Sequence, residues 1–230
     1  MNINRYGIIN YSNNCYLNVI IQLFLSNSET EKLIIEYLNI DNNKINPKKL
    51  LDKLSNKINV NNQNDAQEIF LLILDIIPNL QKHFTNIVVY KYSCSECKNK
   101  HSIKDIFSTF NIYSPSLEDS IYELIKTENF DLDCDNCKKK CNTYKKGSIK
   151  ELGNILVFNN LLKHKLKIVE NITYGDNKYK LTGLIKHFGN QFSGHYIYID
   201  YINKLVIDDI NISSINNIDS SNIYLLFYTL

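Results

Sequence analysis

The sequence predicts an α+β protein in which a helical lobe packs against a β-rich lobe. Apolar residues recur at helical spacing through the first 85 residues, whereas from about Ile87 onward they fall in short β-rich runs separated by turns. Helices that precede strands in this way are typical of α+β folds. A chain of 230 residues is long enough to bury a sizeable core in one domain or in two closely packed ones.

Four helices are expected in the first 85 residues. The first follows the capping residues Ser12, Asn13 and Asn14, and the second and third cover residues 29–39 and 48–58. The fourth is the clearest, because an apolar face repeats at helical spacing until Pro78 stops it. That face comprises Ala66, Ile69, Phe70, Ile73, Leu74 and Ile77.

The rest of the chain is expected to be mainly β-structure with one further helix at residues 117–126. Candidate strands lie at residues 87–93, 102–112, 143–149, 155–158, 179–188, 195–201, 204–207 and 223–228. The Ser- and Asn-rich segment 213–222 is expected to be a surface loop.

Composition and charge narrow the class of protein. The net charge is only +2, which gives no bulk electrostatic reason to expect binding to nucleic acid or to an anionic membrane. The first twenty residues contain Arg5, several Asn and no continuous apolar run, and no apolar stretch is long enough to span a bilayer. We therefore expect a monomer inside the cell, in the cytoplasm or nucleus, and in the host cell if the source is a virus.

Cys15 is a candidate nucleophile because it opens the first predicted helix. Backbone N–H groups and the helix dipole favour a thiolate at that position. Asn10, five residues upstream, is a candidate donor to a developing oxyanion. For an isolated cysteine at a helix start, a small buried apolar residue is the commoner interpretation. The choice between the two therefore depends on the rest of the chain.

His195 is a candidate general base because it stands where a glycine-containing turn enters a strand. A hairpin with the strand at 204–207 would place Asp208 close to the imidazole ring and fix its tautomer. A surface histidine beside an acidic turn is the alternative. Four histidines lack such glycine and acidic neighbours and are expected to be structural or exposed, the last of them within a strand: His83, His101, His164 and His187.

Two CxxC pairs have the spacing of a tetrahedral four-cysteine zinc site. They are Cys94 with Cys97 and Cys134 with Cys137, and two knuckles at the tips of β-hairpins could share one ion. The region shows no open catalytic position, so a structural Zn²⁺ is expected. Cys141 is either an alternative ligand or, as we expect, an ordinary free thiol. Disulfides are the disfavoured alternative, because no secretory signal is expected.

Taken together, these segments resemble the ubiquitin-specific protease family of papain-like cysteine deubiquitinases. GIINYSNNCYLNVIIQ resembles the family's Cys box, NDAQEIF its acid-led helix start, and LIKHFGNQFSGHYIYI its His box. VIDDINIS resembles the block that supplies the third catalytic residue, and the CxxC pairs with ELGNILVF resemble the fingers and the strand entering the palm. The segments occur in the family's order over nearly the whole chain.

The resemblance implies a single catalytic domain with a helical thumb at residues 1–85, zinc-bearing fingers at 86–150 and a β-rich palm at 151–230. It implies cleavage of the isopeptide bond after the C-terminal glycine of ubiquitin, with ubiquitin or ubiquitinated proteins as partners. The alternatives are a protease for a ubiquitin-like modifier and a non-catalytic ubiquitin-binding module. A zinc-stapled interaction protein that touches nucleic acid is a further alternative, which the near-neutral charge disfavours.

The resemblance also implies roles for individual residues. Cys15 is implied as nucleophile, His195 as base and Asp208 as the acid that orients it. Asn10 is implied as oxyanion donor, with assistance from Asp209. The acidic side chains of Asp65 and Glu68 would face the basic C-terminal tail of ubiquitin.

Several positions depart from the family's pattern. Asn14 stands where Thr is usual and Asn64 where Gln is usual, and Lys204 lies near the place of a missing Trp. NNLLKHK replaces the usual Leu-Lys-Arg-Phe run. These departures leave the implied triad intact, so they bear on which modifier is recognised.

Overall fold

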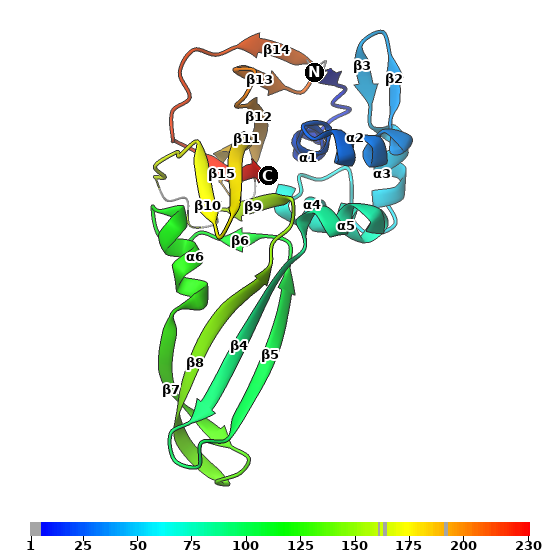
Figure 1. Ribbon diagram of the computed structural model, residues 1–230. Coiled ribbons are helices and arrows are strands. Elements are labelled where there is room, and N and C mark those ends of the chain that lie inside the picture. The colour runs from blue at the N-terminus through cyan, green and yellow to red at the C-terminus, as the bar shows by residue number, and fades with distance from the viewer. Residues whose placement is uncertain (1–5, 161, 163–164, 191–192) are drawn as a thin grey trace.

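The computed structural model describes residues 6–160, 162, 165–190 and 193–230, and its mixture of helices and strands confirms the α+β class (Figure 1). His164 and part of the NNLLKHK segment lie outside the described residues. The helices are α1 (Cys15–Leu25), α2 (Ser28–Ile34), the 3-10 helix η1 (Ile35–Tyr37), α3 (Lys48–Leu54), α4 (Ala66–Ile76), α5 (Pro78–Phe84) and α6 (Leu117–Ile125).

The strands fall into three sheets. They are β1 (Gly7–Ile8), β2 (Asn39–Asp41), β3 (Lys44–Asn46), β4 (Asn86–Cys94), β5 (Lys100–Phe107), β6 (Phe110–Asn111), β7 (Thr127–Cys134), β8 (Lys139–Glu151), β9 (Ile155–Asn159), β10 (Asn171–Tyr174), β11 (Asn177–Gly189), β12 (Gly194–Asp200), β13 (Leu205–Asp208), β14 (Asn211–Ser214) and β15 (Ile223–Thr229). No helix in the described part of the chain is long and apolar enough to cross a membrane.

The expectation of helices alone in the first 85 residues is wrong, and the helices that are present also differ from those expected. Strands β1, β2 and β3 form a small sheet there, and β2 is exposed along its whole length, so it has no alternating apolar pattern to find. In addition, Pro78 not only ends the fourth predicted helix but occupies the first turn of α5, where its missing N–H costs nothing. The second and third predicted helices end earlier than expected, at Ile34 and Leu54.

The β-rich part is as expected in outline but contains strands that the sequence pattern did not indicate. The run at 102–112 is two strands, β5 and β6, and the predicted loop at 213–222 begins within β14. Strand β7 was also missed, because it is exposed at almost every position and carries few apolar residues. Exposed strands of this kind are fixed by their partners in the sheet rather than by their own sequence.

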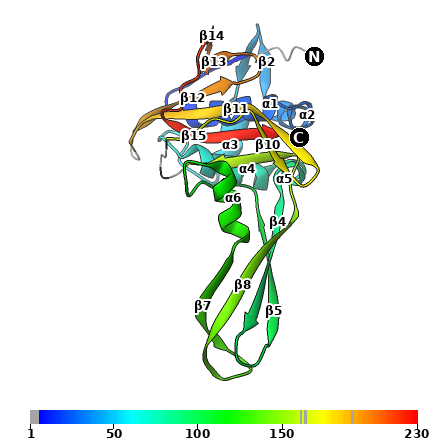
Figure 2. The same ribbon diagram turned by 60° about the vertical axis from the view of Figure 1, so that its left-hand side comes forward.

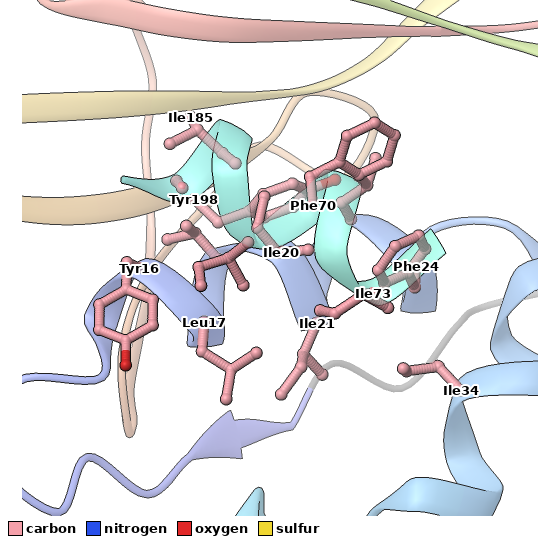
Figure 3. Close-up of a cluster of buried hydrophobic side chains, with 14 of the residues drawn as sticks. Tyr16, Leu17, Ile20, Ile21, Phe24, Ile34, Phe70, Ile73, Ile185 and Tyr198 are labelled. Atoms are coloured by element: carbon pink, nitrogen blue, oxygen red, sulfur yellow. The ribbon is translucent and has the colours of Figure 1, made fainter. Parts of the chain in front are cut away.

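The central sheet separates two hydrophobic cores. Its strand order is β14-β13-β12-β11-β15-β9-β6, with β10 paired to β11. One face packs against α1, α4 and α5, and contributes Ile155, Ile185, Tyr198 and Phe227 to that core. Figure 3 shows Ile185 and Tyr198 meeting residues of α1 and α4. The helix that carries Cys15 is therefore held directly against the strands that carry the histidine.

The long sheet, with strand order β5-β4-β8-β7, projects away from the rest of the molecule (Figures 1 and 2). It is two antiparallel hairpins joined side by side, β4–β5 and β7–β8. Helix α6 lies on one of its faces so closely that a Cβ atom at Gly147 would be 2.2 Å from the carbonyl oxygen of Leu124. Most side chains of β5 and β7 are exposed, so the sheet has little core of its own.

Three aromatic rings join the helices of the N-terminal part. The rings of Phe24 and Phe70 lie 5.9 Å apart, and Phe84 contacts both edge to face at 5.7 and 5.0 Å. All three side chains are fully buried, so they connect α1, α4 and α5 in one packed unit. The division of the chain at residues 85 and 150 into thumb, fingers and palm stays a prediction.

Truncating the central ring tests this packing. Phe70→Ala should lower the free energy of unfolding by about 3–5 kcal/mol, because it leaves a cavity among the other two rings. Leu71→Ala, one residue along α4 and 39% exposed, is the matched control and should change stability by about 0.5 kcal/mol or less. Urea denaturation measures both, and equal losses in the two variants would contradict this account of the core.

Candidate active site and metal centre

The β12–β13 hairpin brings His195 to an acidic partner. Tyr198 pairs with Ile207 in this hairpin, and the turn places the two chain segments antiparallel. The Nε2 atom of His195 lies 2.6 Å from Oδ1 of Asp208. This contact leaves Nδ1 of the ring as the nitrogen that can exchange a proton with another group. The hairpin expected from the sequence is therefore present, with Asp208 against the ring.

Cys15 opens helix α1, as expected, but the capping of this helix is not as predicted. Asn14 occupies the N-cap position without capping through its side chain. Its amide instead accepts from the N–H of Tyr11 and donates to Ile9 and to the Asn18 side chain. The backbone N–H groups of Cys15 and Tyr16 consequently lie against the thiol, where they lower its pKa.

Burial nevertheless favours the neutral form of this thiol. Cys15 is only 2% exposed, and burial raises its pKa above the ordinary thiol value. The backbone N–H of Tyr196, the residue after His195, opposes this effect, while the negative charge of Asp209 adds to it. The start of α1 therefore contacts the start of β12, and the thiol pKa is a balance between burial and oriented amides.

Asp209 joins the histidine-bearing hairpin to the segment around Cys15. One carboxylate oxygen accepts a hydrogen bond of 2.7 Å from Asn10, and the other accepts one of 2.7 Å from Asn18. Its backbone carbonyl accepts a further bond from Ile8. The residue has a φ of +52°, and a Cβ at Gly7 would meet Ile210 at 2.4 Å, so the turn is pressed against strand β1.

Asn10 has a fixed orientation. Its Oδ1 accepts from the backbone N–H groups of Ser12 and Asn14, at 3.2 and 3.1 Å. Its Nδ2 donates to Asp209, which uses one of the two amide hydrogens. The expected oxyanion donor is thus a preorganised amide beside the segment that carries Cys15, and its second N–H has no hydrogen-bond partner among the described residues.

The acidic residues at the start of α4 are placed differently from one another. Asp65 caps the helix through Oδ1, accepting from Gln67 and Glu68, and its other oxygen accepts from the hydroxyl of Tyr224. Glu68 is exposed. Burial, together with the negative charge of Asp65, raises the pKa of both Tyr196 and Tyr224. Asp65 is therefore bound within the protein, while Glu68 is the one that faces outward.

Aromatic rings line the same region. His187 lies in β11, as expected, and stacks on Tyr196 with ring centroids 4.3 Å apart, with Tyr224 next to both. Of the remaining histidines, His83 is buried and His101 stacks on Tyr92 in the long sheet. None of these was expected to be catalytic.

Gln63 makes a contact that the sequence did not indicate. Its side-chain amide donates to the carbonyl of Gly194 at 2.7 Å and accepts from the N–H of Gly194 at 2.8 Å. Gln63 thus connects the loop that leads into α4 with both backbone groups of Gly194, the residue before His195. The position of Gln63 just before the acid-led helix can be read from the sequence, but nothing in its spacing shows which backbone groups its side chain will bind.

The four cysteines of the two CxxC pairs converge at the far end of the long sheet. Their Sγ atoms all lie within 4.8 Å of one another, with Cys94 and Cys137 3.9 Å apart and Cys97 and Cys134 3.6 Å apart. A tetrahedron with metal–sulfur distances of about 2.3 Å has edges of roughly 3.8 Å. The largest influence on Cys97 is the backbone N–H of Asn99, and its pKa is lowered to about 6. This group of thiols can bind a metal ion.

Three kinds of comparison with known proteins give consistent matches. The family model described as "Ubiquitin carboxyl-terminal hydrolase" matches residues 31–228, a range that contains His195, Asp208 and the CxxC pairs and begins after Cys15. The "Probable ubiquitin carboxyl-terminal hydrolase FAF" of Drosophila melanogaster is 25% identical over 202 residues, covering 62% of this chain. The match spans only 7% of that relative's length.

Two solved structures share the fold. The SAGA Ubp8/Sgf11/Sus1/Sgf73 DUB module bound to ubiquitin aldehyde matches with a TM-score of 0.75 at 19% identity, over 99% of this chain and 70% of that one. The same module with a substituted Ubp8, bound to monoubiquitin, matches with a TM-score of 0.77 at 18% identity, over 99% and 69%. At this identity the likeness speaks for the fold alone, and it confirms the fold class expected from the sequence.

Removing the amide of Gln63 tests its contact with β12. In Gln63→Ala the N–H of Gly194 should exchange with solvent about tenfold faster or more, because two hydrogen bonds of about 0.5–1.5 kcal/mol each are lost. Hydrogen exchange followed by mass spectrometry measures this. Gln81→Ala, on the exposed side of α5, is the matched control. Unchanged exchange at Gly194 in the Gln63 variant would show that the contact does not hold the strand.

Neutralising Asp209 tests its influence on the thiol. The negative charge of Asp209 raises the pKa of Cys15, so Asp209→Asn should lower that pKa and move the midpoint of Cys15 alkylation to lower pH. The alkylation rate with iodoacetamide, measured between about pH 6 and 10, reports the midpoint. Asp105→Asn in the long sheet is the control and should leave it unchanged. A midpoint that rises or stays constant in Asp209→Asn would contradict the assignment.

Proposed function

The chain belongs to the ubiquitin carboxyl-terminal hydrolase family, and we propose that it is a thiol-dependent deubiquitinase. The proposed reaction is hydrolysis of the isopeptide bond after the C-terminal glycine of ubiquitin. One observation carries the proposal: the hairpin that binds His195 to Asp208 at 2.6 Å also brings the backbone N–H of Tyr196 to the Cys15 thiol. The proposed nucleophile thus comes from the N-terminal part of the chain, and the proposed base and orienting acid come from one hairpin near its C-terminal end.

In the proposed mechanism, Cys15 transfers its proton to Nδ1 of His195 and attacks the terminal glycine carbonyl. Asp208 holds the ring through Nε2 and stabilises the imidazolium that forms. The imidazolium then protonates the leaving lysine amine, and the C–N bond breaks to leave a thioester on Cys15. Water, deprotonated by His195, hydrolyses this thioester and restores the free thiol.

The oxyanion formed in each step would be bound by the amide of Asn10. Asp209 fixes that amide through one hydrogen, and the other N–H is then free to donate. The helix dipole of α1 and the backbone N–H groups at its first turn also favour negative charge at Cys15. The exposed carboxylate of Glu68 and the negative charge of Asp65 would attract the basic C-terminal tail of ubiquitin to the start of α4.

We further propose that the four-cysteine group holds a structural Zn²⁺. The distances between the sulfur atoms fit a tetrahedral thiolate site, and four thiols are the donor set that zinc prefers. Cys94 and Cys97 belong to the β4–β5 hairpin, and Cys134 and Cys137 to the β7–β8 hairpin. When bound, the ion would cross-link the tips of the two hairpins.

Ubiquitin as partner, a monomeric state and a cytoplasmic or nuclear location complete the proposal. The near-neutral net charge supports the absence of nucleic acid among the partners. Asn14, Asn64 and the NNLLKHK segment depart from the family's pattern. The identity of the modifier, ubiquitin or a ubiquitin-like protein, is therefore the point to test.

A ubiquitin C-terminal fluorogenic substrate and an alkylating ubiquitin probe test the proposed reaction. The wild-type chain should turn over the substrate and label once, at Cys15. Cys15→Ala should abolish both, and Asp208→Ala should lower kcat by about 10²- to 10⁴-fold, because the imidazole loses the group that orients it. Cys141→Ala is the matched cysteine control and should retain turnover.

Other results would overturn the proposal in distinct ways. Full turnover in Cys15→Ala would remove the assigned nucleophile. A wild-type chain that binds ubiquitin but neither turns over nor labels would be a binding module. Turnover of a ubiquitin-like modifier substrate in place of ubiquitin would change the substrate and leave the chemistry intact.

A further inference from the structure

A fifth thiol borders the proposed metal centre. Cys141 lies in β8 opposite Leu132 of β7, and its side chain is 3% exposed. Its Sγ, the Sγ of Cys137 and a carboxylate oxygen of Glu96 all lie within 4.8 Å of one another. The four expected ligands therefore have a fifth, buried thiol next to them, near Cys137.

Of the two neighbours of Cys137, the thiol is the better metal ligand. Glu96 is half exposed and its carboxylate is bound to the ammonium group of Lys139 at 2.7 Å. Zinc prefers thiolate sulfur in structural sites, and a carboxylate that is already paired would have to give up that partner. Cys141 donates a weak hydrogen bond, a 3.5 Å contact from Sγ to the carbonyl of Lys139, and its thiol also interacts with the thiols of Cys137 and Cys94.

We propose that Cys141 is a reserve ligand that replaces Cys137 in the metal site. A change of χ1 moves Sγ by a few ångströms, which is the scale of the gap between the two sulfur atoms. In the exchange, the bond from the metal to Cys137 breaks and one to Cys141 forms. Cys141 loses a proton and Cys137 takes one up, so the charge of the site is unchanged.

The exchange concerns one side of the site, because the thiol of Cys141 interacts with those of Cys137 and Cys94. Cys97 and Cys134 face each other at 3.6 Å and do not belong to the group that contains Cys141. A metal held in this way stays bound when Cys137 is removed, whereas loss of a ligand on the other side leaves three thiolates. The inference rests on the proposed metal centre and is independent of the proposed hydrolase activity.

Cobalt substitution in the full-length chain tests the proposal. Thiolate-to-Co²⁺ charge-transfer bands count the sulfur ligands, and competition with a chelator gives the Zn²⁺ affinity. Cys137→Ser should keep the wild-type bands and an affinity within about tenfold of wild type. Cys134→Ser, the matched control in the same knuckle, should bind more weakly by about 100-fold or more, since even second-shell partners are worth about 10- to 100-fold.

The deciding comparison is Cys137→Ser with and without Cys141. The double variant Cys137→Ser/Cys141→Ser should fall to the affinity of Cys134→Ser, whereas Cys141→Ser alone should bind as wild type does. Equal affinity of Cys137→Ser and the double variant would overturn the reserve ligand, and any general effect of the first substitution on folding cancels in this comparison. A wild-type chain that takes up no Co²⁺ would overturn the metal centre itself. This result is distinct from failure of the proposed hydrolase activity, because turnover of ubiquitin substrates is measured separately.

Discussion

The carboxylate of Asp209 is the connection on which the arrangement of the site depends. It binds Asn10 and Asn18, one through each oxygen, and its carbonyl holds the backbone of Ile8. The first two belong to the segment that carries Cys15, while Asp209 itself follows the residue that orients His195. A residue held at positive φ by contacts on both sides fixes the distance between these segments. The proposed nucleophile and base are therefore located by a neighbour that needs no contact with substrate.

The same carboxylate has an opposing electrostatic effect. Its charge, together with burial, favours the neutral thiol, while the amides of Tyr196, Tyr16 and Cys15 favour the thiolate. A positively charged imidazolium beside the thiol would favour the thiolate. Gln63 holds the backbone of Gly194 immediately before the histidine. Positioning and reactivity are thus separate properties, set by different side chains of the same site.

Much of this could be predicted from the sequence, and the rest failed for physical reasons. The Cys15 helix, the His195–Asp208 hairpin and the cysteine knuckles rest on local periodicity and short-range spacing, which a single sequence displays. The strands β2, β7 and β14 lack buried faces, so their pairing depends on the partner strand. The contacts of Gln63 and of Asp209 join residues more than a hundred positions apart, and Asn14 turned its side chain away from the cap it was expected to form. Hydrogen bonds of this kind follow from the completed fold, and no local pattern specifies them.

The long sheet gives a physical reason for the metal ion proposed at its far end. Near the central sheet, β4 and β8 are held by α6 against Gly147 and by the buried Val88, whereas β5 and β7 are exposed over most of their length. Hydrophobic burial therefore stabilises one end of the two hairpins and gives little at the other. An ion that joins Cys94 and Cys97 to Cys134 and Cys137 closes the loop between the hairpins where packing is weakest. A reserve thiol at Cys141 would keep this cross-link if one ligand were lost, in addition to the pairing of β4 with β8 and the ion pair between Glu96 and Lys139, which also join the two hairpins.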